Sequence, residues 1–221
     1  MPHEPTGSRV PVMLTVAVAA VRRRSRVGGR FMLPRTRGMI LPVWVALLRG
    51  INVGGRNRLP MADLRELFAS LGCKNVGTYI QSGNVIYDCS GAVASKIDSL
   101  VSAGIRERHG YEVPVVTRRG KELVAAVQRN PFVGSADPAH LSVAFLAKRP
   151  TAADVAKLDA DRSPPDRFTV LGSEIHLYMP DGVAGSKLTN QYFDSRLKTV
   201  STARNWRTVH KLIELTGAGT A

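Results

Sequence analysis

The chain has 221 residues, is 44% hydrophobic and 22% charged, and so has the composition of an ordinary soluble protein that can bury a core. Its formal charge of +14 would usually indicate nucleic acid or an anionic surface as a partner. The distribution of the charge weakens that inference, because residues 1–40 carry eight arginines against one glutamate and account for half of the total. The rest of the chain is only mildly basic.

The first forty residues show no lasting periodicity apart from the apolar run Val10–Val21. This run is too short to span a bilayer, but it has the length of a signal-peptide core. We predict that residues 1–40 are a disordered or mis-annotated extension and that Met39 is the natural start. Secretion, with cleavage near Ala20, is the alternative. The body has the character of a cytoplasmic protein with no membrane association.

The body begins with a pattern of strands and helices that predicts a first α+β half over residues 41–130. Hydrophobic runs bounded by Gly and Pro indicate the strands, and apolar residues at helical spacing indicate the helices. Pro114 favours an edge position for the last strand. The expected elements are strand Val43–Leu48, helix Pro60–Leu71, strands Val76–Ile80 and Val85–Cys89, helix Ala92–His109, strand Tyr111–Thr117 and a linking helix Gly120–Arg129.

The same kinds of pattern predict a second half over residues 131–216, followed by a tail at 217–221. The expected elements are strand Leu141–Ala147, helix Thr151–Ala160, strands Phe168–Leu171 and Glu174–Tyr178, helix Lys187–Leu197 and a last helix Asn205–Leu215. The order β-α-β-β-α-β of the first half is typical of the split β-α-β arrangement, and we interpret the second half as similar to the first. We therefore predict an α+β protein of two ferredoxin-like (split β-α-β) halves with antiparallel sheets and a C-terminal helix.

Short loops rich in glycine, amides and cations stand where these strands end or helices begin. They are Arg49-Gly-Ile-Asn-Val-Gly-Gly-Arg-Asn57, Gln81-Ser-Gly-Asn84, Ser186-Lys-Leu-Thr-Asn190 and Thr202-Ala-Arg-Asn-Trp206. Unpaired backbone N–H groups at such places favour anions. With Ser186 and Thr202 as expected N-caps, Lys187 and Arg204 each place a cation in a first helical turn, where it opposes the helix dipole unless an anion binds there.

A structural explanation also exists for each loop. The segment Arg49–Asn57 lacks the sequence of a P-loop and of a dinucleotide-binding loop, so it can equally be a tight turn with solvated arginines. Gly83 and Asn84 suit a short hairpin turn for conformational reasons alone.

Four segments resemble the bacterial family known as domain of unknown function 1697 (DUF1697). They are Ala46-Leu-Leu-Arg-Gly-Ile-Asn-Val-Gly-Gly, Tyr79-Ile-Gln-Ser-Gly-Asn-Val, Ser186-Lys-Leu-Thr-Asn and Arg204-Asn-Trp-Arg-Thr-Val, in the family's order. The resemblance covers about residues 41–216. It implies a two-part α+β fold of ferredoxin-like halves and a start near Met39. It implies no established activity, cofactor or catalytic residue.

The remaining chemistry-bearing residues indicate no catalytic centre. The histidines show no metal-ligand spacing, and the carboxylates form no acid–base pair, so no metal site is predicted. Cys73 and Cys89 lie in apolar segments and are expected to be buried free thiols. The sequence leaves enzymatic activity, cofactors and oligomeric state open.

We therefore predict that the loops form one polar, cationic pocket for a small phosphorylated or carboxylated compound, including a nucleotide. Weak, salt-sensitive nucleic-acid binding is the alternative, although the low aromatic content (6%) argues against a base-stacking surface. The second alternative is that the loops are purely structural. The predicted ligand-binding residues are Arg49, Asn52, Gly54, Gly55, Asn57, Gln81, Asn84, Lys187, Asn190, Arg204 and Asn205.

Overall fold

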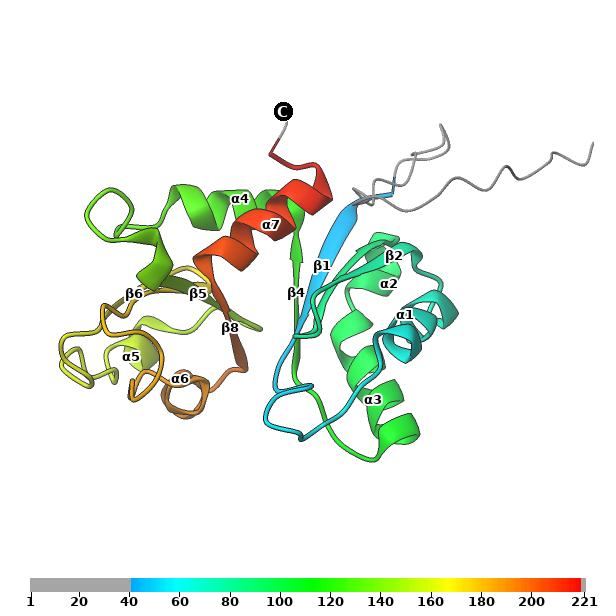
Figure 1. Cartoon of the computed structure of the whole chain (residues 1–221), viewed down its shortest axis with the longest axis horizontal. Helices are drawn as coiled ribbons and strands as arrows, with labels where there is room; N and C mark the ends of the chain where they lie inside the picture. The colour runs from blue at the N-terminus through cyan, green and yellow to red at the C-terminus, as the bar shows by residue number, and fades with distance from the viewer. Residues whose placement is uncertain (1–40, 220–221) are drawn as a thin grey trace, which may run out of the picture. The chain divides into compact units, whose positions relative to one another are not determined.

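A computed structural model of the chain describes residues 41–219; the predictions for the N-terminal extension and for a start at Met39 lie outside these residues. The elements of the first half are β1 (Val43–Leu48), α1 (Met61–Ser70), β2 (Lys74–Tyr79), β3 (Asn84–Asp88), α2 (Gly91–Ala94), α3 (Ile97–His109), β4 (Val115–Arg119) and α4 (Gly120–Gln128) (Figure 1). Those of the second half are the 3-10 turn η1 (Pro138–His140), β5 (Leu141–Leu146), α5 (Ala152–Val155), β6 (Arg167–Leu171), β7 (Glu174–Tyr178), α6 (Asn190–Leu197), β8 (Ser201–Asn205) and α7 (Trp206–Thr216).

The two sheets have the same topology. Each has four antiparallel strands, in the order β2-β3-β1-β4 in the first and β6-β7-β5-β8 in the second. This is the strand order of a split β-α-β unit. The predicted α+β class with two such halves and a C-terminal helix is therefore confirmed. The limits of the halves, 41–130 and 131–216, remain predictions.

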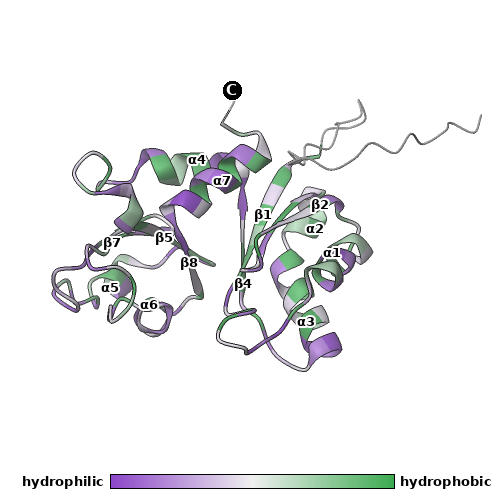
Figure 2. Ribbon diagram, viewed as in Figure 1, coloured by the Kyte–Doolittle hydropathy of each residue, from purple (hydrophilic) through white to green (hydrophobic). Residues whose placement is uncertain are grey.

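Alternation along the central strands divides the apolar side chains among three cores. In β1, Ala46 and Leu48 face α1 and α3, whereas Val45 and Leu47 face an inner core. In β5, the inner core takes Val143 and Phe145, and the opposite face packs under α5 and α6. β1 is largely green in Figure 2, as expected for a strand that is covered on both faces.

The inner core joins the two halves. It contains side chains of β1 and β4 from the first sheet, of β5 from the second sheet, and of the helices α4 and α7 that follow the last strand of each half. The Asn205 side chain accepts a hydrogen bond from the N–H of Thr208 and caps α7, whose Val209, Leu212 and Thr216 are buried at helical spacing. No helix within residues 41–219 is long and apolar enough to cross a membrane.

Several predicted boundaries are wrong. The helix expected over 92–109 is interrupted at Ser95–Lys96, and the one expected over Thr151–Ala160 is a single turn. The last strand of the second half, β8, was not predicted at all. The sequence predicts a helix start here, with Thr202 as N-cap, but the N-cap of α7 is Asn205 and Arg204 lies in the strand.

His176 of β7 is a buried imidazole in a position where neither ring nitrogen has a hydrogen-bond partner among the described residues. Burial, helped by the nearby charge of Arg129, lowers the pKa of His176 from 6.5 to about 4. The unfolded chain therefore binds one more proton than the folded chain between these two pH values. The contribution of neutral His176 to the free energy of unfolding is therefore complete above pH 6.5 and is lost as the pH falls toward 4.

We expect acidification through this window to lower the free energy of unfolding by about 2 kcal/mol on account of His176. His176→Leu should remove this part of the pH dependence and stabilise the protein near pH 4.5. Urea unfolding between pH 4.5 and 7 measures the pH dependence of the free energy of unfolding. The variant His210→Gln is the control for loss of an exposed imidazole. An unchanged pH dependence in His176→Leu would contradict the assignment.

Candidate functional site

The loop after β1 is held closed by its own amide side chains. Asn52 has a positive φ of 54°, donates from its amide to the backbone oxygens of Leu59 (2.9 Å) and Gln81 (3.0 Å), and accepts from the N–H of Leu59 (2.8 Å). Asn57 donates to the Gly50 oxygen at 3.0 Å. These amides therefore close the loop and attach it to the β2–β3 turn.

The exposed tip of this loop is a backbone turn, in which the N–H of Arg56 donates to the Val53 oxygen at 3.1 Å. Gly54 and Gly55 have φ values of 58° and 74°, which a side chain would strain, and a Cβ at either position would meet nothing within 4 Å. Arg56 and Arg58 are exposed. The glycines thus serve the backbone turn.

Arg204 of β8 ties the second half to the first. The side chain is only 9% exposed, and burial lowers its pKa to about 10, so it is charged at neutral pH. Nε donates to Oδ1 of Asn84 (2.6 Å), and Nη2 donates to the backbone oxygen of Leu48 (2.7 Å) and lies 3.2 Å from that of Gly83. Nη1 donates within β8, to Thr202 Oγ1 and the Ala203 oxygen, both at 2.8 Å.

An arginine of the first half makes the equivalent contact with the second half. Arg118, the fourth residue of β4 as Arg204 is of β8, donates from Nη2 to the backbone oxygens of Leu146 (2.7 Å) and Ser173 (3.0 Å) in the second half. Where Arg204 meets the amide of Asn84, Arg118 meets the carboxylate of Glu174, with Nε 3.6 Å from Oε1. We call Arg118 and Arg204, with these partners, the reciprocal arginine pair.

The electrostatics of the two arginines differ. Burial lowers the pKa of Arg118 and raises that of Glu174, and the attraction between them offsets part of both shifts. Arg129 adds a second cation, 2.8 Å from Glu174 Oε2. Arg204 has no carboxylate partner in the part of the chain that the structure describes, so its charge is met only by neutral oxygens.

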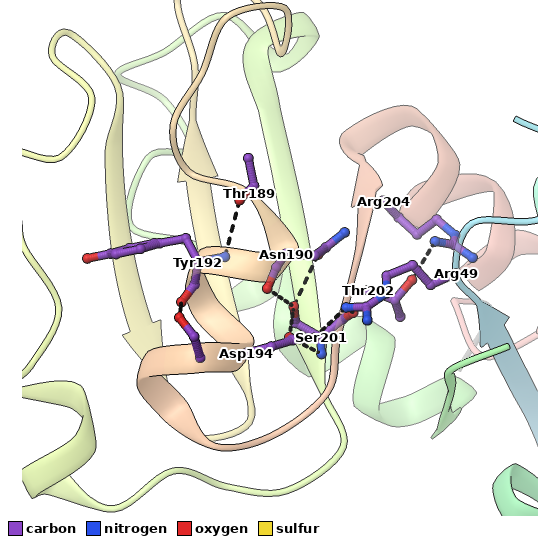
Figure 3. A network of polar contacts seen from close by, with 9 residues as sticks. Arg49, Thr189, Asn190, Tyr192, Asp194, Ser201, Thr202 and Arg204 are labelled. Carbon is purple, nitrogen blue, oxygen red and sulfur yellow. Dashed lines mark hydrogen bonds and ion pairs between the residues drawn. The ribbon is translucent and has the colours of Figure 1, made fainter. Parts of the chain in front are cut away.

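A second polar network joins the loop after β1 to α6 (Figure 3). Arg49 Nη1 donates to Asp194 Oδ2 (2.6 Å) and to the backbone oxygen of Ser201 (2.8 Å). Asp194 Oδ1 accepts from the N–H and the hydroxyl of Ser201, at 2.7 and 2.6 Å. The same hydroxyl lies 3.1 Å from Oδ1 of Asn190, the first residue of α6. This network fixes the start of α6 against β8.

The network predicts unequal costs for its two charged members. The Arg49–Asp194 pair is partly exposed, and we expect a coupling of about 1 kcal/mol in a double-mutant cycle of Arg49→Met and Asp194→Ala. Asp194→Ala alone should cost more, about 2 kcal/mol, because it also leaves the buried Ser201 N–H and hydroxyl without their acceptor. Urea unfolding of the four proteins measures both values; equal single-variant costs would contradict this arrangement.

The start of α6 differs from the prediction. Its N-cap is Thr189, whose hydroxyl accepts from the N–H of Tyr192, and the helix begins at Asn190. Ser186 instead accepts from the N–H of Leu188 in the preceding turn. Lys187 is therefore exposed outside the helix, not in its first turn, and the expected mismatch with the helix dipole does not arise.

A cavity of about 320 Å³ opens beside this helix start, on the face of the second sheet that α6 covers. Its residues come from strands β5, β7 and β8, from the 183–189 loop and from α6. They are Ser142, Ala144, Leu177, Met179, Val183, Ser186, Leu188, Thr189, Asn190, Phe193, Ala203, Arg204 and Asn205.

The cavity combines an apolar floor with a polar, electropositive end. Leu177, Met179 and Phe193 supply apolar surface. Within residues 41–219 no carboxylate lines the cavity. Arg204 belongs to the lining, but its guanidinium is bound on the opposite face of the sheet, at the junction with the first half. The first N–H groups of α6 lack intrahelical acceptors and add positive potential, and exposed Lys187 stands between two lining residues.

The predicted pocket residues are thus divided. Asn190, Arg204 and Asn205 line the cavity, and Lys187 adjoins it. The others belong to the loop after β1, the β2–β3 turn and the junction of the halves, and they do not line it: Arg49, Asn52, Gly54, Gly55, Asn57, Gln81 and Asn84. Whether any of them binds a ligand stays a prediction. Ser142, a polar residue inside a buried strand, is a lining residue that sequence reasoning missed.

The described residues include no group of three or more His, Cys, Asp and Glu side chains that could hold a metal ion. Cys73 and Cys89 are buried free thiols, as predicted.

Comparison with known proteins gives a family and a fold. The family model described as "Protein of unknown function (DUF1697)" matches residues 41–176. A solved structure, "The structure of conserved bacterial protein SP0830 from Streptococcus pneumoniae", is similar with a TM-score of 0.60 at 20% identity, over 80% of this chain and 99% of that one. No curated protein matches the chain. At this identity the similarity concerns the fold alone.

Proposed function

The chain belongs to the family described as protein of unknown function (DUF1697), and from that premise we propose that it binds a small organic anion in the cavity at the start of α6. The ligand is a carboxylated or phosphorylated compound with an apolar part. Its anionic group lies near the first N–H groups of α6 and Lys187, and its apolar part lies over Leu177, Met179 and Phe193.

One observation carries the proposal: within residues 41–219 the cavity has the N-terminus of α6 at its polar end and no carboxylate in its lining, and exposed Lys187 adjoins it. Charged ligands bind best where buried donors and dipoles already point toward the site. The cavity volume of about 320 Å³ stands at the lower end of the range for small-molecule sites and favours a compact ligand.

A thermal-shift and calorimetric titration of the full chain tests the proposal. The probes are inorganic phosphate, hexanoate, a nucleoside monophosphate, a dinucleotide and a short oligonucleotide. We expect a saturable rise in Tm with at least one small anion, persisting at moderate salt, since a ligand at a hundred times its Kd adds about 2.7 kcal/mol to stability.

Two variants locate the binding. Lys187→Ala should weaken binding about five-fold through loss of one charge contact, and Lys121→Ala, at another exposed lysine, is the matched control. Val183→Trp places a large side chain at a 72% exposed lining position and should block the cavity without disturbing the core. Saturable binding with the same Kd in the Lys187→Ala and Val183→Trp variants as in the unmutated chain would contradict this location.

A different result would favour the nucleic-acid alternative. A rise in Tm with the oligonucleotide only, disappearing as salt increases, would indicate phosphate contacts spread over the basic surface. No response to any small anion would contradict the proposal.

We propose in addition that the protein acts in the cytoplasm, which the absence of a disulfide between its two buried cysteines in this structure supports. Fractionation of the native cells tests this proposal, and recovery outside the cytoplasm would contradict it.

A further inference from the structure

Cys73 and Cys89 lie opposite each other at the open end of the β2–β3 hairpin. The antiparallel register pairs Lys74 with Asp88, so the residue before β2 faces the residue after β3. The two Sγ atoms are 3.5 Å apart.

The backbone hydrogen bonds at this position favour the geometry that a disulfide requires. The N–H of Cys73 donates to Phe68 and that of Cys89 to Pro42, so the two residues form a cross-strand pair without hydrogen bonds between them. Such pairs bring Cα atoms to about 4.5 Å, which is within the range of disulfides. A bond requires the sulfurs to approach by a further 1.5 Å or so, roughly a side-chain rotation.

We propose that Cys73 and Cys89 form a reversible dithiol–disulfide pair, oxidised by a low-molecular-weight disulfide such as oxidised glutathione. The thiolate of Cys73, the more accessible at 6% exposure, attacks one glutathione sulfur and releases one glutathione thiol. Cys89 then gives up its proton and attacks Cys73 Sγ in the mixed disulfide, releasing the second glutathione thiol. Two protein thiols are oxidised and one glutathione disulfide is reduced.

The surroundings make this reaction slow. Burial, together with Cys89, raises the pKa of Cys73 to about 12, so little thiolate is present at neutral pH. β2 is an edge strand with an irregular register between Lys74 and Gly77, so it can open locally to admit the oxidant. Oxidation closes the hairpin at the end opposite the turn that carries Asn84, the partner of Arg204.

The test treats the full chain with oxidised glutathione without denaturant and follows intact mass, peptide mapping and Tm. We expect loss of two hydrogen atoms, a Cys73–Cys89 cross-linked peptide, and a Tm higher by several degrees that dithiothreitol reverses. Cys89→Ser should instead accumulate a glutathione adduct on Cys73, because no second thiol resolves it. Cys73→Ser should remain largely unmodified, because Cys89 is fully buried.

If a serine variant fails to fold, comparison of the unmutated chain before and after treatment with oxidised glutathione still tests the proposal. Two free thiols that persist after a day of exposure to the oxidant would overturn the proposal. A disulfide that forms only between chains, or only in denaturant, would overturn it as well.

Discussion

Replacing Arg204 by methionine is expected to lower the free energy of unfolding by about 4 kcal/mol. The variant leaves Asn84 Oδ1 and the Leu48 oxygen buried without the donors that now lie at 2.6 and 2.7 Å. Each orphaned acceptor costs about 1–3 kcal/mol, and relief of the buried charge returns part of that loss. Urea unfolding at neutral pH measures the difference.

Matched variants separate the role of the guanidinium from that of its charge. Arg204→Lys keeps the charge but has a single nitrogen, which cannot reach Asn84, Leu48 and Thr202 together, so it should lose most of the same stability. Arg207→Met, at an exposed position in α7, should change stability by less than about 0.5 kcal/mol. A loss below about 1 kcal/mol in Arg204→Met would contradict the role of this residue.

Glu174→Gln should destabilise the protein by about 3 kcal/mol. The substitution preserves shape but removes the carboxylate that lies 3.6 Å from Nε of Arg118, whose side chain is 9% exposed. Glu122 also attracts Arg118, but more weakly than Glu174. A buried cation that loses its partner retains its desolvation cost without the attraction that offset it. The exposed neighbour Arg129 also loses its 2.8 Å contact, which contributes little.

The control distinguishes the buried contact from the exposed one. Arg129→Met removes only the exposed partner and should cost less than about 1 kcal/mol, because Arg129 is 52% exposed. If Glu174→Gln and Arg129→Met cost the same, the buried Arg118–Glu174 contact does not stabilise the fold as described.

The parts of the fold that burial dictates could be predicted from the sequence. The continuous apolar run of β1 indicated a buried strand, and the two faces of this strand pack into different cores. The short link at 81–84 indicated a hairpin, and it joins β2 to β3. The order of these elements was sufficient for the fold class, because a split β-α-β unit leaves few other arrangements.

β8 could not be predicted because the side chains that it turns toward the first half are polar, so the segment lacks the apolar pattern of a buried strand. Thr202 and Arg204 face the first half, and they occupy positions at which a core strand would carry Val or Ile. The hydrogen-bond acceptors of Arg204 in the first half lie more than a hundred residues away in sequence. A Ser-Thr-Ala-Arg-Asn segment therefore had the local pattern of a helix cap. Only the tertiary contact makes it a strand.

The candidate site shows the same limit. An asparagine that closes its own loop, such as Asn52, has the same local sequence as one that would bind a ligand. The sequence located these loops, but it could not indicate that those around Asn52 and Asn84 lie at the junction of the halves while the 186–190 loop lies beside a cavity. Ser142 was missed because a lone serine in an apolar strand carries no motif.

The most direct test is a two-dimensional ¹H–¹⁵N spectrum of the full chain titrated with inorganic phosphate and, separately, with hexanoate. The account predicts saturable shifts concentrated at the amides of Lys187, Asn190 and Gln191, with smaller shifts at Phe193 and Leu177 for hexanoate. Shifts confined to residues 49–57, or spread without saturation over the exposed arginines, would contradict it.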